Sequence, residues 1–512
     1  MRWGGWVWAL LLPVIPASAK TLNLHGVDAP VTLDWNGLAT TTEAPVLNLI
    51  GEGLFRFAPG SGKLLPALAE SVDKSKDLKI YTFTIRRDAK WSDGRPVSAR
   101  DFVDSWLRLL SPQSTSLYLY YLCDIEGARE FHRTPNLSPS SVGITAVDDR
   151  ILKVRLERPV ANWERIPTFW PMFPVRKDLL EKFGDRAWRP GTLLSTGPFV
   201  FDSAEPGKKI TLKRNRYYTR ARTNIDQVDL YFDQDLNRSY EKYRSGFYRF
   251  LQAIPPEKIS LHKGKDLRQP KMYRNHVLLV NAKKFPMSNR DFRAAVMRSI
   301  DTSVLSRGRE TLFSPAKSMV PASLGGVEET IVEKQDREGA RKALKDSGIL
   351  VSRGLKLRIL TRMEEPSGSF GKGIQEQIQD ALGIDVELAA LHSKEFGTYA
   401  SLSDYDLVLI FWSAKVPVAR DFLLPYGGES TNSRLKFDSP VYDRWVEQLG
   451  AVPDGAEARR ALREAMTEYL VREHVVLPLA DEKNTVLVGP KIKNLEFDFM
   501  GFPVLNDAIL SD

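Results

Sequence analysis

The residue types that most often carry chemistry are present in this chain, but they do not stand at catalytic spacings. Its six histidines are isolated from one another, so no two of them are spaced to bind one metal ion. The chain contains no G-x-S-x-G, no H-E-x-x-H and no C-x-x-C motif. The adjacent carboxylates Asp148-Asp149 and Glu364-Glu365 would face opposite ways on a strand. We therefore expect no enzyme, no catalytic residue, no metal site and no cofactor.

A glycine-rich segment, GSFGKG at residues 368–373, has some features of a phosphate-binding loop. It lacks the serine or threonine that follows the lysine of such loops, and it lacks the preceding strand-to-loop spacing. We interpret the segment as the flexible entry to a helix.

A single lysine, Lys415, follows the apolar run LVLIFW at residues 407–412. A continuous apolar run is typical of a strand that is buried on both faces, as in a parallel sheet. Open α/β folds bind their ligands at the ends of such strands. Lys415 is therefore a candidate for ligand binding by an ammonium group.

The bulk composition predicts an ordinary folded protein of more than one domain. A chain of 512 residues is too long for one hydrophobic core, so we expect two or three domains. The net charge is +9, but no stripe interleaves the basic residues with aromatic ones, so nucleic-acid binding is not expected. The only cysteine, Cys123, cannot form an internal disulfide, and we expect it to be a small buried apolar residue.

The first 19 residues have the pattern of a secretory signal peptide. Arg2 is followed by an apolar stretch at residues 3–15 and by Ala17-Ser18-Ala19, which predicts cleavage before Lys20. No other apolar stretch approaches the length of about 20 residues that a membrane helix needs. Since no cysteine follows the cleavage site, we expect no lipid anchor, and we expect the mature protein in a Gram-negative periplasm.

Strand and helix patterns alternate along the chain. Residues 80–86 alternate as a strand, and Ser98 with Asp101 predicts a capping box at the start of the next helix. Further helices are predicted from about Ser288, over 374–382 with an end at Gly383, and from Asp454. A strand at 384–388 follows Gly383 directly. The alternation in the last half indicates an open α/β domain.

A more specific pattern lies between residues 65 and 112. It contains YTF, then KWSDG at 90–94, PV at 96–97 and DFV at 101–103. One further motif, GEGL, precedes this segment at 51–54. The others follow it in order, and they are DIEGA at 124–128, PV at 174–175, GPF at 197–199, LKRN at 212–215, DFRAA at 291–295 and LGIDV at 382–386. Over nearly the whole mature chain this series resembles the extracytoplasmic peptide-binding proteins of ABC importers.

The resemblance implies an α/β fold, namely a two-lobed periplasmic binding protein with a third, extra domain, mixed sheets and an interlobe ligand cleft. By resemblance, lobe one comprises residues 20–52, 175–272 and 485–512, the extra domain 53–174, and lobe two 273–484. Lobe closure would bury the ligand, and the importer would recognise the closed form.

The function that the resemblance implies is capture of a solute by a monomeric protein. The protein would bind a small-molecule or peptide-like ligand and deliver it to ABC permease subunits in the inner membrane. An alternative is a binding module that reports to a sensor, or one whose cleft no longer serves transport. In this family the segment that carries Trp91 and Asp93 is structural, so neither residue is expected to act in binding.

The cleft departs from the family pattern at the strand end that was described first. Peptide binders of the family read Gly-Trp-x-Ala-Asp-Tyr there, and the aspartate takes the ligand's α-ammonium group. Here Trp412 and Ala414 are retained, but Lys415 replaces the aspartate. The family's tyrosine-rich run is HVLLV at 276–280, and the early cleft loop has no acid at its tip. By resemblance, the ligand cleft contains Thr41, His276, Leu279, Trp412, Ser413, Ala414 and Lys415.

Three interpretations of Lys415 remain open. Its ammonium group either faces the cleft and binds an anionic or carboxylate-bearing ligand, or extends to solvent and pairs with a neighbour such as Asp421. In the third interpretation Asp421 takes over the acidic role. Because Lys415 stands where the family has its amine-binding aspartate, the ligand is not expected to be a standard peptide with a free amine.

Overall fold

The structure is a computed structural model that describes residues 19–511 apart from 38–41, 61, 322–323, 325–328, 352–353, 365, 403, 429–434 and 454. The predicted signal peptide up to residue 18, and the predicted site residue Thr41, lie outside the described residues. Among the described residues, no helix combines the length and the apolar character that crossing a bilayer requires.

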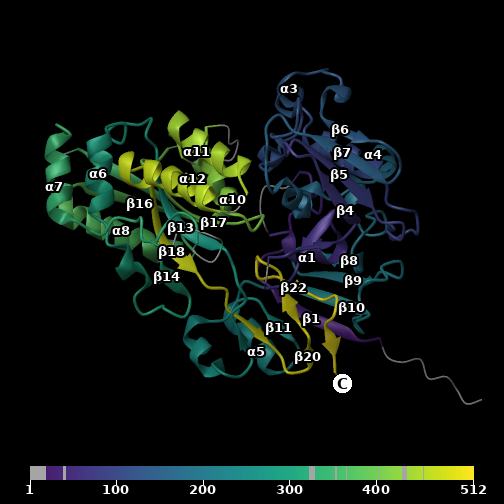
Figure 1. The fold of residues 1–512 in the computed structure, drawn as a ribbon. Helices are drawn as coiled ribbons and strands as arrows, with labels where there is room; N and C mark the ends of the chain where they lie inside the picture. The colour runs from purple at the N-terminus through teal and green to yellow at the C-terminus, as the bar shows by residue number, and fades with distance from the viewer. Residues whose placement is uncertain are drawn as a thin grey trace, which may run out of the picture.

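The first large sheet has seven strands in the order β12-β19-β11-β1-β10-β9-β8 and forms the lobe that we call lobe one (Figure 1). At its centre β1 runs parallel to both β10 and β11, while β9 and β19 pair antiparallel with their neighbours. The strands are β1 (Thr21–Gly26), β8 (Phe199–Glu205), β9 (Lys209–Arg214), β10 (Gln227–Phe232), β11 (Phe250–Leu251), β12 (Leu267–Arg268) and β19 (Val486–Val488).

The second large sheet has six strands in the order β14-β18-β13-β17-β15-β16 and forms lobe two. Its strands are β13 (Arg274–Val280), β14 (Phe313–Pro315), β15 (Lys356–Arg362), β16 (Asp385–Leu391), β17 (Leu407–Ser413) and β18 (Val476–Glu482). The apolar run before Lys415 is β17, which pairs parallel with β15 but antiparallel with β13. The sheet is therefore mixed, and β17 is a central strand of it.

A third sheet of four antiparallel strands, β4-β5-β7-β6, lies above lobe one in Figure 1 and marks the extra domain. Its strands are β4 (Ala69–Lys74), β5 (Ile80–Ile85), β6 (Ile144–Ala146) and β7 (Ile151–Arg155), and helix α2 (Ala99–Leu109) packs on it. The predicted capping box at the start of α2 is confirmed, because Ser98 and Asp101 each bond the other's backbone amide, at 2.8 and 3.4 Å.

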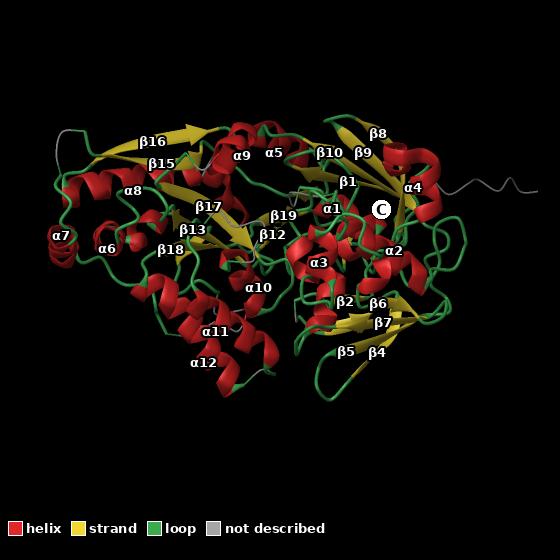
Figure 2. Ribbon diagram, turned by 90° about the horizontal axis from the view of Figure 1, so that it is seen from above, coloured by secondary structure: helices red, strands yellow, loops and turns green. Residues whose placement is uncertain are grey.

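The remaining helices and strands surround these sheets (Figure 2). The helices are α1 (Ala44–Ile50), α3 (Ala128–Arg133), α4 (Lys177–Phe183), α5 (Leu236–Arg244), α6 (Arg290–Arg298), α7 (Arg337–Asp346), α8 (Ser367–Leu382), α9 (Ser393–Leu402), α10 (Ala419–Leu423), α11 (Pro440–Ala451) and α12 (Ala456–Thr467). The short strands are β2 (Phe55–Phe57), β3 (Leu64–Pro66), β20 (Ile492–Lys493), β21 (Glu496–Phe497), β22 (Pro503–Val504) and β23 (Ile509–Leu510).

Most predicted helix ends agree with the structure to within about two residues, but α8 begins at Ser367 and not at residue 374. The interpretation of residues 368–373 as a flexible entry to the helix is therefore wrong, because this segment forms its first turns, in which Phe370 and Gly371 are buried. Helix α6 begins at Arg290 and not at Ser288, because the side chain of Asn289 accepts the backbone N–H of Phe292 as the N-cap. Helix α8 ends at Gly383, whose φ of 68° is the left-handed conformation that favours glycine. The predicted helix start at Asp454 lies outside the described residues, and α12 begins at Ala456.

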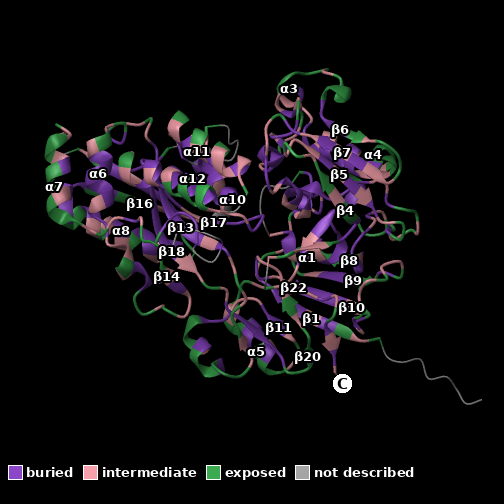
Figure 3. Cartoon of the chain, in the orientation of Figure 1, coloured by how far each residue is buried: buried purple, intermediate pink, exposed green. Residues whose placement is uncertain are grey.

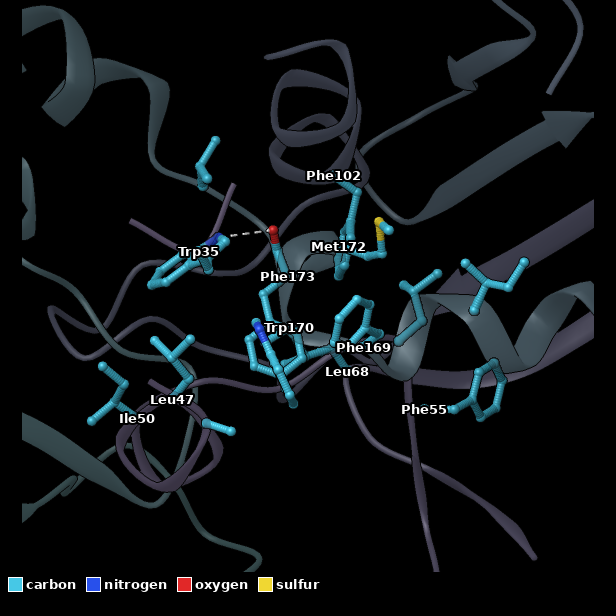
Figure 4. Close-up of a cluster of buried hydrophobic side chains, with 14 of the residues drawn as sticks. Trp35, Leu47, Ile50, Phe55, Leu68, Phe102, Phe169, Trp170, Met172 and Phe173 are labelled. Atoms are coloured by element: carbon cyan, nitrogen blue, oxygen red, sulfur yellow. Dashed lines mark hydrogen bonds between the residues drawn. The ribbon is translucent and has the colours of Figure 1, made fainter. Parts of the chain in front are cut away.

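Two large hydrophobic cores divide the molecule (Figure 3). One is continuous between lobe one and the extra domain, and Trp35 and Phe173 belong to it; Trp35 Nε1 donates to the Phe173 carbonyl at 3.2 Å (Figure 4). The other lies within lobe two. Cys123 lies at the edge of the first core and is only half-buried, with its Sγ 3.7 Å from the Leu119 carbonyl oxygen. Lobe two is thus the part of the fold with a separate core.

The chain crosses between the two lobes at residues 269–273, just before β13, and at 483–485, just after β18. Both crossings join the lobe-two sheet at the end of the strands where β17 also ends. The end of β17, with Lys415, therefore lies close to the junction of the lobes.

Candidate functional site

Lys415 is buried at the end of β17, with 5% of its surface exposed. Its Nζ donates to the Ser413 carbonyl oxygen at 2.7 Å and lies 4.9 Å from the centre of the Trp412 ring. No ion pair of Lys415 with a carboxylate is found in the described part of the chain. Burial, together with the nearby positive charge of Arg274, lowers the pKa of Lys415 to about 7. The ammonium group therefore neither reaches solvent nor pairs with an acid in this structure.

Asp421 contacts the backbone of Lys415 and not its ammonium group. Its Oδ2 accepts the backbone N–H of Lys415 at 2.6 Å and that of Val416 at 3.2 Å. Its Oδ1 accepts the hydroxyl of Tyr121, which belongs to the extra domain. Burial raises the pKa of Asp421 to about 8, although the two backbone bonds oppose the shift. Asp421 thus ties the loop after β17 to the extra domain.

Trp412, Ser413 and Ala414 lie beside Lys415, as the sequence predicts. Trp412 is 8% exposed and packs in the lobe-two core. The Ser413 hydroxyl accepts from Arg274 Nε at 2.7 Å, and the Ala414 amide donates to the Tyr273 carbonyl at 2.8 Å. The structure therefore brings together four of the seven predicted cleft residues.

His276 lies one residue from this group along the neighbouring strand, so its side chain is on the opposite face of the sheet from Trp412. Its Nε2 is 2.9 Å from Glu482 Oε2, and Arg274 Nη1 is 3.1 Å from the other oxygen of that carboxylate. Burial opposes ionisation, but Arg274 and His276 outweigh it and hold the pKa of Glu482 at about 2. The predicted residue Leu279 pairs with Val408 in the core and lies about 13 Å further along β13 than residue 275.

Lobe two also makes direct contacts with the extra domain beside Asp421. Arg420 donates from both Nη atoms to the carboxylate of Asp124, at 2.9 and 3.2 Å. Arg158 bonds the same carboxylate at 3.0 Å and also contacts Glu447 of lobe two. Although burial opposes it, Arg420 and Arg158 lower the pKa of Asp124. A charged, hydrogen-bonded junction therefore closes one side of the interface between these parts.

A cavity of about 70 Å³ lies next to this junction. The extra domain contributes Tyr121, Val160, Asn162 and Ile166 to its lining, and lobe two contributes residues of the segment 416–424 and of the segment 449–458. The lining is mostly apolar, and the carboxyl of Asp421 and the guanidinium of Arg420 are its charged groups. The interface between the lobe-two loop and the extra domain is therefore closely packed.

Two polar residues that sequence analysis did not select also lie at this end of the sheet. Asn275 on β13 pairs with Trp412 on β17 and with Asp481 on β18. Each stands close to an apolar run, because Asn275 lies two residues before VLLV at 277–280 and Asp481 follows the run VVLPLA. Their role was hidden because strands so far apart in sequence can be aligned only with a structure.

Among families of known proteins, the chain matches the model described as "Bacterial extracellular solute-binding proteins, family 5 Middle" over residues 63–434. Curated relatives match over nearly their full length. The periplasmic murein peptide-binding protein MppA of Escherichia coli is 25% identical, with 96% of this chain and 91% of the relative covered. The probable deoxycholate-binding periplasmic protein YgiS of the same organism is 27% identical, with 96% and 92% covered.

Solved structures show the same fold. The structure of E. coli MppA superposes with a TM-score of 0.85 at 23% identity and covers 96% of this chain and 98% of its own. The complex of Haemophilus influenzae OppA with the peptide RPPGFSPFR gives a TM-score of 0.83 at 23% identity, with 97% and 99% covered.

Proposed function

Since the chain belongs to family 5 of the bacterial extracellular solute-binding proteins, we propose that it is the substrate-binding component of an ABC importer. The family consists of binding proteins and not enzymes, and the curated relatives named above are periplasmic. In this proposal the protein is a periplasmic monomer, released from its signal peptide before Lys20, and it delivers its ligand to the permease in the inner membrane.

The proposed ligand site is the end of β17, where Trp412, Ser413, Ala414 and Lys415 meet the junction of the lobes. The observation that carries this assignment is the buried ammonium group of Lys415, which lies on the Trp412 ring and has no acidic partner in the described part of the chain. A buried ammonium without a counter-charge is unfavourable. A ligand that brings an anionic group to this position would remove that cost.

The ligand class follows from the charges at this site. Lys415 replaces the family's amine-binding aspartate, and Asp421, the acid that contacts the backbone of Lys415, is occupied by two backbone amides and by Tyr121. We therefore propose a ligand that carries an anionic group, or a peptide-like ligand whose amine is blocked, in place of a peptide with a free amino-terminus.

A second candidate function is a sensing module whose cleft no longer serves transport. It is favoured by the direct contacts between lobe two and the extra domain, which leave a cavity of only about 70 Å³ at their interface. Genes for permease and ATPase subunits next to this one would support the importer, and an isolated gene would support the sensing module.

Native mass spectrometry of protein purified from its own periplasm tests the proposal. The importer predicts a co-purified small molecule with an anionic group or a blocked amine, and Lys415→Met should lose it. A bound peptide with a free amine would contradict the ligand class, and ligand-free protein from cells in every growth condition would favour the sensing module.

The domain limits given above, 20–52, 175–272 and 485–512 for lobe one, 53–174 for the extra domain and 273–484 for lobe two, are part of the proposal. The three sheets and the two chain crossings support this division. Because lobe two has its own core, limited proteolysis should cut first near residues 269–273 or 483–485. Cleavage that begins inside β13 or β18 would contradict it.

A further inference from the structure

Three neighbouring residues at the lobe-junction end of the lobe-two sheet each carry a buried polar atom without a protein partner. The atoms are Asn275 Oδ1, Trp412 Nε1 and Asp481 Oδ1, and none of them has a hydrogen-bond partner in the described part of the chain. Asn275 is the direct cross-strand partner of both Trp412 and Asp481. Direct partners project from the same face with Cβ atoms about 5 Å apart. The three residues therefore form one polar row across β17, β13 and β18.

The fold has no evident use for this row. Asn275 is completely buried. Its Nδ2 donates a hydrogen bond to the Met319 carbonyl at 2.6 Å, whereas its Oδ1 accepts none in the described part of the chain. Buried polar atoms are normally hydrogen-bonded, and leaving one unpaired is destabilising. Asp481 is half-buried, so its end of the row lies nearest the surface, although its Oδ1 is covered. Lys415 Nζ lies against the Trp412 ring, so the row adjoins the proposed ligand site.

The atoms of the row define which chemical group would satisfy them. The indole N–H of Trp412 is a donor and needs an acceptor, whereas Asn275 Oδ1 is an acceptor and needs a donor. The carboxyl of Asp481 has no basic partner, and burial favours its protonated form, in which it both donates and accepts. A neutral group that combines a donor and an acceptor matches the row, and an amide is such a group.

We propose that Asn275, Trp412 and Asp481 form a subsite for an amide group of the ligand, with the amide carbonyl on Trp412 Nε1 and its N–H on Asn275 Oδ1. The inference rests on the proposed function and narrows its ligand class. The ligand is an acylated amino compound whose amide occupies the row and whose anionic group lies at Lys415. The acyl group is thus the blocked amine that the loss of the family's aspartate permits.

Four forms of one amino acid test the two groups separately by titration calorimetry, because Lys415 Nζ lies only 4.9 Å from the Trp412 ring and the amide and the anionic group must therefore be close together. They are alanine, N-acetyl-alanine, alanine amide and N-acetyl-alanine amide. N-acetyl-alanine is expected to bind best, about tenfold more tightly than alanine for one added hydrogen-bonded group. Trp412→Phe and Asp481→Ala should each reduce this preference for the acetyl group. A matched control, Tyr248→Phe, removes an unpaired buried hydroxyl in lobe one and should leave it unchanged.

The outcomes separate the subsite from the function on which it rests. A preference for the free carboxylate over the carboxamide reports on Lys415, and this preference should disappear in Lys415→Met. If the wild type shows no such preference, the proposal of an anionic ligand is wrong. An acetyl preference that is absent, or that survives in both Trp412→Phe and Asp481→Ala, would overturn the subsite alone. If none of the four forms binds, the acylated, peptide-like ligand class is wrong.

The melting temperature of the ligand-free protein gives a second readout. Because Asp481 Oδ1 is buried and unpaired, Asp481→Ala should keep or raise the melting temperature while it lowers the acetyl preference. If Asp481→Ala lowers the melting temperature and leaves the acetyl preference unchanged, Asp481 stabilises the sheet and does not bind the ligand.

Discussion

Asp421 and Lys415 are in contact, but the contact is between the carboxylate of Asp421 and the backbone amide of Lys415, at 2.6 Å, while the ammonium group donates to the Ser413 carbonyl at 2.7 Å. Two buried groups that could have formed an ion pair are therefore each held by other partners. The carboxyl group of Asp421 fixes the loop after β17. The amino group of Lys415 has no acidic partner in the described part of the chain, so burial lowers its pKa to about 7.

Stability should rise with pH above neutrality because of Lys415. Its pKa is about 7 in the folded protein and has its ordinary value of 10.5 in the unfolded chain, so between these values the unfolded state binds more protons. The free energy of unfolding then increases as pH rises from about 7 to about 10, by at most about 1.4 kcal/mol per pH unit. Lys415→Met should abolish this rise. The raised pKa of Asp421, about 8, acts in the opposite direction and lowers stability as pH rises towards 8 in both proteins, so the difference between them reports on Lys415.

Urea denaturation of both proteins at pH 7 and pH 9.5 measures the effect. Lys345→Met, which removes an exposed lysine of α7, is the matched control and should keep the wild-type pH dependence. Equal pH dependence in wild type and Lys415→Met would show that the folded protein does not bury the ammonium.

The ion pair between Arg420 and Asp124 should favour the closed arrangement of lobe two against the extra domain. Both residues are buried, so Arg420→Met leaves the Asp124 carboxylate with Arg158 alone, and removing one partner of such a pair costs about 3 kcal/mol. That is more than a hundredfold shift toward an open form. Small-angle scattering of the ligand-free variant should give a larger radius of gyration than the wild type.

Arg444→Met, which changes an exposed arginine on α11, should leave the radius of gyration unchanged. A saturating ligand should make the open variant compact again. If Arg420→Met scatters like the wild type without ligand, the junction does not control closure.

Asp93 should be inert in ligand binding despite its place in the conspicuous KWSDG segment. Its carboxylate pairs with Arg176 at 2.8 Å near the surface of the extra domain, and such pairs contribute less than about 1 kcal/mol. Asp93→Asn should therefore change neither affinity nor melting temperature appreciably. Trp91→Ala is the contrast, because Trp91 is fully buried and bonds Asp101 at 3.1 Å, and its loss should cost about 3 kcal/mol of stability. Loss of ligand binding in a well-folded Asp93→Asn protein would contradict a structural role.

The parts of this fold that could be predicted are those that local sequence controls. The capping box of Ser98 and Asp101 and the left-handed Gly383 mark helix ends. Both could be predicted because a helix cap involves only residues a few positions apart in the sequence. The strand at residue 407 was predicted from its apolar run. Its mixed pairing was not, because the antiparallel partner β13 lies more than a hundred residues away in sequence.

The same limit applies to the site. The resemblance placed Trp412 and Lys415 at one strand end, and the structure agrees. The direction of the ammonium depends on the Ser413 carbonyl and the Trp412 ring, which sequence spacing does not specify. Asn275 and Asp481 join Trp412 only through the register of three strands, so no local pattern could have grouped them.

Titration calorimetry with unmodified tri- to pentapeptides at about pH 6 tests whether Lys415 has replaced an amine site. Below its pKa of about 7 Lys415 is charged, and two positive charges about 4 Å apart repel by roughly 4 kcal/mol at an effective dielectric constant near 20, which is about three decades in affinity. We expect no tight binding of free-amine peptides to the wild type, and at most a partial gain in Lys415→Asp, since the family's tyrosines are also absent. Micromolar binding of such peptides to the wild type, with the amine lodged beside residue 415, would contradict the loss of the amine site.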